Sequence, residues 1–414
     1  MTGREALAFR LCLLAIALYL VDDAFVHPEP GTGAGDHLAG GLVPTAILAL
    51  LAAGVPRLRR AGAGAAVALA LGLGTLAVGI AVPVRHVTLQ GPSGDDWTGM
   101  LALLAGAVLV VLGARLLWTT RRLDTPHRRR YLRRTAIAVA ALLVAFQLLL
   151  PIPFAFIATH KARSDVEAVD LGRPAEDVDV RTSDGLTLRG SYAPSRNGAA
   201  VVVFPGRSGP LPQARMLARN GYGVLVLDPR GEGESDGDFN SLGYGGVPDL
   251  EAAARYLRER PDVDGGRVGG LGLSVGGELM LEAAATSADL RAVVSEGAGV
   301  RSHREQLDMP DAGRWTTLPF WAVTSAATAV FGNAPIPAAL TDLTPRIAPR
   351  PVFLIWATNG NAEELNVPYF EAAGPPKRRW EIPEAEHTGG LDARPAEYER
   401  QVVGFSDAAL APRR

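Results

Sequence analysis

The feature that most constrains this fold is the length of its apolar runs. Four runs approach or reach the roughly 20 apolar residues that a helix needs to cross a bilayer. They occupy residues 38–55, 61–84, 97–118 and 135–158, and a fifth, weaker run lies at residues 6–26. We therefore expect residues 1–158 to form an all-α membrane domain of about five transmembrane helices, which makes the lipid bilayer a partner.

The first run allows a second interpretation. Its apolar centre, LCLLAIALYLV, is short and follows Arg4 and Arg10, a pattern that is also typical of a signal peptide. No small-residue cleavage site follows it, so we favour a span. Whether this run is cleaved stays open at the level of sequence.

Basic residues between the runs indicate the orientation of the chain. RLRR at residues 57–60 follows the second span, and the arginine-rich segment at residues 121–134 follows the fourth. The loops at residues 22–37 and 85–96 contain Arg85 as their single Lys or Arg. Cytoplasmic loops carry the excess of Lys and Arg, so we expect a cytoplasmic N-terminus. Everything after about His160 is then extracytoplasmic, and cleavage of the first run would leave this orientation unchanged.

Composition narrows the function classes. A formal net charge of −2 gives no indication of nucleic-acid binding, and the single cysteine, Cys12, excludes an internal disulfide or a cysteine zinc site. His27, Asp36 and His37 are metal-ligand types in an outward loop, but we favour a solvated loop over a metal site. We expect no metal and no cofactor, and the sequence does not fix the oligomeric state.

After a linker at residues 159–174, the pattern changes to that of an α/β domain over residues 175–411. VDVRTSDGLTLRGSYAP reads as a β-hairpin. Short apolar runs then alternate with helix-like segments, which predicts a mostly parallel sheet covered on both faces; the runs lie at residues 199–206, 222–231, 267–274, 291–299 and 351–357. Residues 300–350 break this alternation, and we expect them to form a helical lid over the carboxyl edge of the sheet.

The stretch GLGLSVGG places Ser274 in a Gly-x-Ser-x-Gly motif. With 47 glycines in the chain, the motif alone is a weak signal. Its context strengthens it, because it ends an apolar run and opens a helix-like segment, as a nucleophile on a strand–turn–helix requires. We therefore predict Ser274 as a nucleophile.

A serine nucleophile needs a base and an acid that orients it. His387 follows the last expected strand, RRWEIP, where the chain order nucleophile, acid, histidine requires the base, whereas His303 lies too early. The loop after the run 351–357 contains no aspartate, so we predict Glu363 or Glu364 as the acid and do not separate them. Glu296, at the end of the preceding run, is the remaining alternative.

The oxyanion formed by attack on a carbonyl needs hydrogen-bond donors. The backbone N–H of Val275, directly after the serine, is one candidate. The turn PGRSG after the run 199–206 offers the other, and we nominate the N–H of Arg207.

Four segments together carry a family resemblance over residues 175–411: VVVFPGRSG, GYGVLVLDPRGEGESDGD, GLGLSVGG and EIPEAEHTGG. In this order they resemble the α/β-hydrolase superfamily, in a branch related to dienelactone-hydrolase-like and prolyl-oligopeptidase-like serine hydrolases. The stretch from Asp228 to Ser235 resembles the D-x-R-G-x-G-x-S loop that braces the active-site floor in such enzymes. The acid position departs from the family pattern.

The resemblance implies a serine hydrolase that cleaves an ester, thioester or amide through an acyl-serine intermediate, and the apolar runs predict that it is anchored in the membrane. A small-molecule or lipid-like acyl group is then the expected substrate. The alternative is a catalytically silent hydrolase fold that serves as a sensor or binding module on a membrane scaffold, because a fold alone does not imply activity.

Overall fold

The structure is a computed structural model of the whole chain. It describes residues 1–61, 64–119, 131–132, 135–136, 139–140, 143–163, 169–206, 211–309, 313–358 and 363–412. These residues form two compact units. A helical unit comprises Met1–Ala162 and Pro319–Ala334, and an α/β unit comprises Arg163–Leu318 and Pro335–Arg414.

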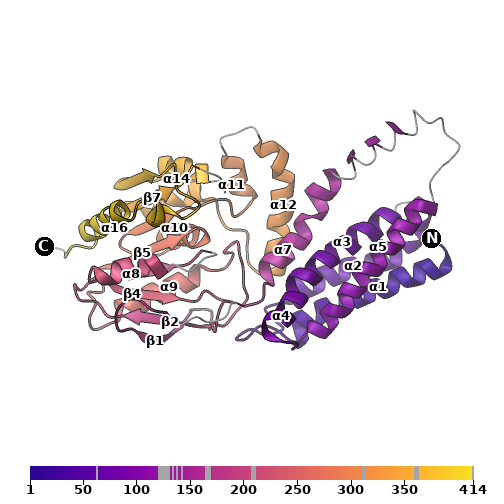
Figure 1. Cartoon of the computed structure of the whole chain (residues 1–414), viewed down its shortest axis with the longest axis horizontal. Coiled ribbons are helices and arrows are strands. Elements are labelled where there is room, and N and C mark those ends of the chain that lie inside the picture. Colours follow the sequence, from indigo (N-terminus) through magenta and orange to yellow (C-terminus); the bar gives the residue numbers. More distant parts are fainter. Residues whose placement is uncertain are drawn as a thin grey trace. The chain divides into compact units, whose positions relative to one another are not determined.

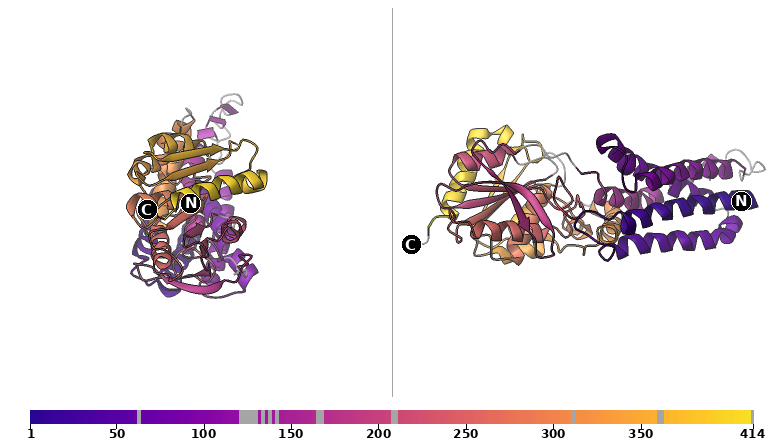
Figure 2. Two further views of the ribbon diagram at one scale, coloured as in Figure 1. Left: turned by 90° about the vertical axis from the view of Figure 1, so that its left-hand side faces the viewer. Right: turned by 90° about the horizontal axis from the view of Figure 1, so that it is seen from below.

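The long helices of the helical unit run alongside one another (Figures 1 and 2). They are α1 (Gly3–Val21), α2 (Leu38–Ala61), α3 (Gly64–Gly79) and α5 (Asp96–Thr119), and the shorter elements are η1 (Asp22–Val26), η2 (Ile80–Val84), α4 (Arg85–Gln90), η3 (Ala145–Leu149) and α7 (Pro151–Thr159). Glycine lets α3 and α5 approach closely: a Cβ on Gly72 would lie 2.8 Å from the carbonyl oxygen of Gly106. Small residues at such contacts are typical of packed membrane helices.

Three helical stretches of the described chain are long and apolar enough to cross a membrane: Leu38–Val55, Gly64–Gln90 and Asp96–Thr119. The first predicted run forms α1, but Arg4, Glu5 and Arg10 make it more polar than these three. Within the last predicted run, Ala145–Thr159 form a shorter apolar helix. Most of the arginine-rich segment at residues 121–134 lies outside the described residues.

The α/β unit is built on one eight-stranded sheet with the order β1-β2-β4-β3-β5-β6-β7-β8. Its strands are β1 (Glu176–Arg181), β2 (Thr187–Ala193), β3 (Ala200–Phe204), β4 (Gly223–Leu227), β5 (Val268–Leu273), β6 (Val293–Glu296), β7 (Val352–Trp356) and β8 (Lys377–Glu381). The predicted hairpin forms the antiparallel pair β1 and β2. The strands β4, β3, β5, β6, β7 and β8 lie side by side in this order, and each pairs in parallel with the next. The mostly parallel α/β-hydrolase sheet is therefore confirmed.

Side chains that alternate between the two faces of the sheet explain why helices cover both of these faces. Val202 of β3 lies in a core with α9 (Val247–Arg258) and α10 (Val275–Thr286), whereas Val201 and Val203 lie in a second core with α8 (Leu211–Arg219) and α16 (Pro395–Ala409). Successive side chains of a strand point to opposite faces, so a strand that is apolar throughout needs a helical layer on each side.

The insertion after β6 is helical, as predicted. It contains α11 (His303–Asp308), α12 (Arg314–Phe331), α13 (Leu340–Leu343) and η4 (Thr344–Ile347). However, Pro319–Ala334, which the sequence places in the hydrolase half, pack within the helical unit. There the ring of Phe320 stacks on that of Phe146 with centroids 5.5 Å apart, and the ring of Phe331 meets that of Phe156 at 5.1 Å.

Candidate active site

Ser274 lies on a tight turn between β5 and α10. Its backbone angles, φ 52° and ψ −124°, fall in a region that non-glycine residues rarely adopt. Glycine on either side makes the turn sterically feasible: a Cβ on Gly272 would lie 2.1 Å from the oxygen of Gly276, and one on Gly276 would lie 2.4 Å from the oxygen of Pro205. This is the strained strand–turn–helix geometry that presents a nucleophile above a sheet.

The turn after β3 packs directly against the serine turn. A Cβ on Gly206 would lie 2.7 Å from Cβ of Ser274 and 2.8 Å from the oxygen of Leu273. Val275 is the first residue of α10, where backbone N–H groups have no partner within the helix. Arg207, the other predicted oxyanion donor, lies outside the described residues.

Three predicted side chains are joined by hydrogen bonds. Nε2 of His387 lies 2.8 Å from Oγ of Ser274, and Nδ1 of His387 lies 2.5 Å from Oε1 of Glu363. A carboxylate next to Nδ1 favours the tautomer with the proton on Nδ1, which leaves Nε2 free to accept the serine proton. The side chain of His387 is 30% exposed, whereas that of Glu363 is 1% exposed.

The structure separates the three glutamates that the sequence leaves open. Glu363 begins η5 (Glu363–Leu365), and its second oxygen accepts a 2.7 Å bond from the N–H of Ala357 just after β7. Glu364 is exposed. The carboxylate of Glu296 bonds instead to the N–H of Gly390 and to the hydroxyl of Tyr398.

Sequence reasoning missed the residues that hold the loop after β6. The N–H of Gly299 donates to Oε1 of Glu278 at 2.8 Å, and its carbonyl accepts from the hydroxyl of Tyr369 at 2.8 Å. Burial raises the pKa of Glu278 to about 7, although the charge of Arg301 opposes this shift. Glu278 and Tyr369 are distant in sequence, so no local pattern indicates their shared role.

The loop that resembles the family's D-x-R-G-x-G-x-S motif is internally braced. Arg230 pairs with Asp249 at 2.7 Å and with Asp184 at 2.9 Å. The hydroxyl of Ser235 donates to the carbonyl of Asp228 at 2.7 Å. These bonds fix the loop after β4 without involving Ser274 or His387.

The polar residues in the loop after η1 bond to nearby groups. Nδ1 of His27 lies 2.9 Å from Asp22, Nε2 of His37 lies 2.9 Å from the hydroxyl of Thr32, and Asp36 accepts from the N–H of Gly33. Within the part of the chain that the structure describes, no group of three or more His, Cys, Asp or Glu side chains is arranged to hold a metal ion.

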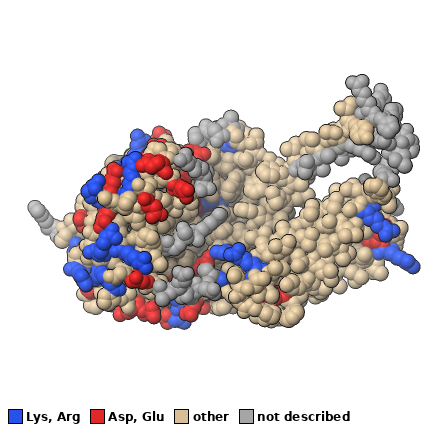
Figure 3. All heavy atoms as spheres, viewed as in Figure 1, with Lys and Arg blue, Asp and Glu red and all other residues tan. Residues whose placement is uncertain are grey.

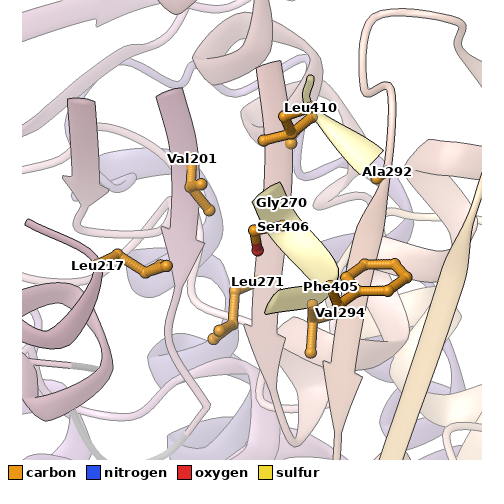
Figure 4. A pocket seen from close by; sticks show the side chains of 10 residues that line it. Val201, Leu217, Gly270, Leu271, Ala292, Val294, Phe405, Ser406 and Leu410 are labelled. Carbon is orange, nitrogen blue, oxygen red and sulfur yellow. The ribbon is translucent and has the colours of Figure 1, made fainter. Parts of the chain in front are cut away.

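Figure 4 shows a small cavity between the sheet and α16. Its volume is about 10 Å³, room for about one water molecule. Its lining is largely apolar and includes Val201, Leu217, Phe405 and Leu410. The cavity contains none of the predicted site residues and belongs to the core beneath α16.

Comparison with known proteins gives relatives that match part of this chain. A polyketide transferase, grgF, of a Penicillium species is 35% identical over 130 residues, which is 30% of this chain and 44% of that protein. The uncharacterized protein YfhR of Escherichia coli O157:H7 is 27% identical over 264 residues, covering 58% of this chain and 82% of its own. A thiohydrolase, aneE, of Aspergillus aculeatus is 32% identical over 131 residues, covering 29% of this chain and 40% of its own.

Among solved structures, the esterase Pf2001 of Pyrococcus furiosus is 19% identical and aligns with a TM-score of 0.48 over 60% of this chain and 99% of that one. The family model described as X-Pro dipeptidyl-peptidase (S15 family) matches residues 151–358, half of the chain. With its α/β-hydrolase fold, this chain is a hydrolase that belongs to the X-Pro dipeptidyl-peptidase (S15) family.

Proposed function

We propose that this chain is a membrane-anchored serine hydrolase that cleaves an ester, thioester or amide bond through an acyl-Ser274 intermediate. The observation that carries the proposal is the continuous hydrogen-bonded series from Ser274 through His387 to Glu363. A serine hydroxyl is a weak nucleophile unless a base lies within hydrogen-bond reach. Here the base is at 2.8 Å and is itself held by a buried carboxylate.

In the proposed reaction, Oγ of Ser274 attacks the acyl carbonyl carbon while Nε2 of His387 takes the hydroxyl proton. The negative charge that forms on the carbonyl oxygen is stabilised by the backbone N–H of Val275 and, in our proposal, by that of Arg207. The imidazolium returns its proton to the leaving group as the bond to it breaks. Water then attacks the acyl-serine with His387 again as base, which releases the acid and restores Ser274.

In this cycle Glu363 accepts the hydrogen bond from Nδ1 of His387. Its role is to hold His387 in the productive tautomer and to stabilise the imidazolium. The hydrogen bond from the N–H of Ala357 fixes the second carboxylate oxygen, so the carboxylate cannot rotate away from His387.

The helical unit supports the membrane anchor. Three of its described helical stretches have the length and composition of membrane spans. Charged side chains are abundant on the visible surface of the α/β unit and sparse on that of the helical unit (Figure 3). A helical surface with few charges suits contact with lipid, because placing a charged side chain at the centre of the bilayer costs about 2.5–3.5 kcal/mol on the insertion scale.

The apolar insertion and the closeness of the two units in sequence bear on the substrate class. We favour an ester or lipid-like acyl group over a long peptide, because the insertion is apolar and the α/β unit begins directly after the membrane unit. Two of the relatives, a polyketide transferase and a thiohydrolase, have names that are compatible with acyl substrates, and thioesters stay within the proposed class.

The test is to label intact cells with a membrane-impermeant fluorophosphonate probe, which reacts covalently with activated serines. We expect the full-length protein to be labelled, and Ser274→Ala and His387→Ala to remain unlabelled. Ser287→Ala and His303→Ala are matched controls that should be labelled like the wild type, because neither residue takes part in the proposed mechanism.

Two other outcomes would revise the proposal. Labelling that occurs only after permeabilisation would overturn the extracytoplasmic orientation but retain the serine mechanism. A folded wild type that stays unlabelled before and after permeabilisation would reject the mechanism and favour a binding module.

A further inference from the structure

Glu296 is a buried carboxylate beside the proposed nucleophile. It is the last residue of β6 and is 2% exposed. In the register of the sheet it lies opposite Leu273 of β5, and its carbonyl oxygen accepts a 2.8 Å bond from the N–H of Ser274. The main chain of Glu296 is therefore fixed to the serine turn.

The side chain of Glu296 reaches a different loop. Oε1 accepts a 2.9 Å bond from the N–H of Gly390, and Oε2 accepts a 2.5 Å bond from the hydroxyl of Tyr398. Gly390 begins α15 (Gly390–Ala393) and follows His387 by three residues. A Cβ on Gly390 would lie 2.8 Å from Oε1 of Glu296, so only glycine permits this close approach. One residue thus contacts both the serine turn and the histidine loop.

The histidine loop needs such support. Thr388, directly after His387, has φ 55°, a conformation that is strained for a β-branched residue and that persists only when surrounding contacts impose it. Gly297 packs against this loop: a Cβ on it would lie 2.8 Å from Cγ2 of Thr388 and 3.2 Å from Cε1 of His387. The position of the imidazole therefore depends on how firmly the loop is held to the end of β6.

We propose that Glu296 is a positioning residue that holds the β8–α15 loop so that Nε2 of His387 stays in hydrogen-bond reach of Ser274. This inference rests on the proposed function and adds a residue that does not touch the substrate. Glu363 orients the imidazole ring through Nδ1, whereas Glu296 fixes the loop that carries it.

The ionisation state of Glu296 connects this role to pH. Burial and, to a smaller extent, the charge of Glu363 raise the pKa of Glu296 to about 7, against the bonds from Tyr398 and Gly390 and the charge of His387, which lower it. The ionised carboxylate is the stronger acceptor for the N–H of Gly390. The tether is therefore complete above about pH 7 and weakens as the pH falls below that value.

The experiment compares Glu296→Ala, Glu296→Gln and Tyr398→Phe with the wild-type full chain in detergent, using hydrolysis of p-nitrophenyl butyrate and the rate of fluorophosphonate labelling between pH 5 and 9. Glu296→Ala removes the tether, so we expect kcat and the labelling rate to fall at least tenfold with KM changed less than threefold. Glu296→Gln keeps an amide oxygen for Gly390, so it should restore most of that loss.

The pH profile separates positioning from general stability. In the wild type, Glu296 should contribute to the rise of activity through neutrality, and Glu296→Gln should remove that contribution. Tyr398→Phe removes a bond that lowers the pKa of Glu296 and should shift the rise to higher pH. Thermal unfolding of each variant identifies any that does not fold.

The outcomes are distinguishable. Folded Glu296→Ala that reacts at the wild-type rate, or an unchanged pH profile in both Glu296→Gln and Tyr398→Phe, would overturn the role of Glu296 and leave the serine mechanism intact. A folded wild type that neither hydrolyses the ester nor labels would overturn the proposed function and this inference with it.

Discussion

At the residue scale, the three glutamates that are candidates for the acid share one chemistry and differ in surroundings. Glu363 is buried against His387, Glu364 is exposed, and Glu296 is buried against Gly390. A carboxylate sets the tautomer of a histidine base only where it meets Nδ1 directly. Distance and burial, rather than residue type, therefore assign the proposed roles.

Substitution of the two neighbouring glutamates tests this assignment. Glu363→Gln replaces the acceptor at Nδ1 of His387 by an amide and favours the wrong tautomer, so we expect the labelling rate to fall by about two to four orders of magnitude. The matched change Glu364→Gln should stay within about twofold of the wild type. The two rates are compared with a fluorophosphonate probe at pH 8, and equal loss in both variants would contradict the assignment.

At the scale of the element, glycines set how closely β5 and α10 meet. Gly272 faces main-chain atoms of Gly276 and Gly277, at 2.1 Å and 2.7 Å from the position of a Cβ. Backbone atoms cannot move aside as a flexible side chain can. The strand, the serine turn and the helix therefore form one rigid element on which the nucleophile is mounted.

Gly272→Ala is accordingly expected to lower the free energy of unfolding by about 1–3 kcal/mol and to abolish labelling, because the added methyl group displaces the serine turn. Gly404→Ala in α16 is the control: a Cβ there meets nothing within 4 Å, and alanine in a helix interior should stabilise by about 0.5–1 kcal/mol. Denaturant unfolding in detergent measures both, and a Gly272→Ala variant as stable as the wild type would contradict the packing argument.

At the scale of the whole molecule, the chain forms two units and passes between them more than once. After the α/β unit begins, residues Pro319–Ala334 return to the helical unit. There the N–H of Phe320 donates to the side chain of Gln147 at 3.0 Å, and its ring contacts those of Phe146 and Phe154. Pro319–Ala334 therefore belong to the helical unit, and we expect this segment to act as a second membrane attachment.

Cysteine accessibility tests this attachment. In a Cys12→Ser background, we expect Ala322→Cys and Ala326→Cys, both exposed in the structure, to react at least tenfold more slowly with a membrane-impermeant maleimide than Ser183→Cys in the β1–β2 turn. Lipid would shield the α12 positions, whereas the turn is open to water. Equal rates in intact membranes would contradict the embedding of α12, and reaction after denaturation serves as the control for total thiol.

The sequence by itself determined the features that local pattern encodes. The apolar runs predict the helical region, because a bilayer requires uninterrupted apolar length. The alternation of apolar strands and helical segments predicts the parallel sheet. The Gly-x-Ser-x-Gly motif and the chain order nominate Ser274 and His387, which the structure joins at 2.8 Å.

Only the tertiary structure decided what depends on contacts between distant residues. Glu363 and Glu364 are neighbours in sequence, and only the fold shows that Glu363 is the one that turns toward His387. The tether from Glu296 to Gly390 spans 94 residues, and no periodicity encodes it. The return of Pro319–Ala334 to the helical unit is likewise invisible locally, because an apolar helix packs equally well against a sheet or against other helices, and only the assembled fold selects its partner.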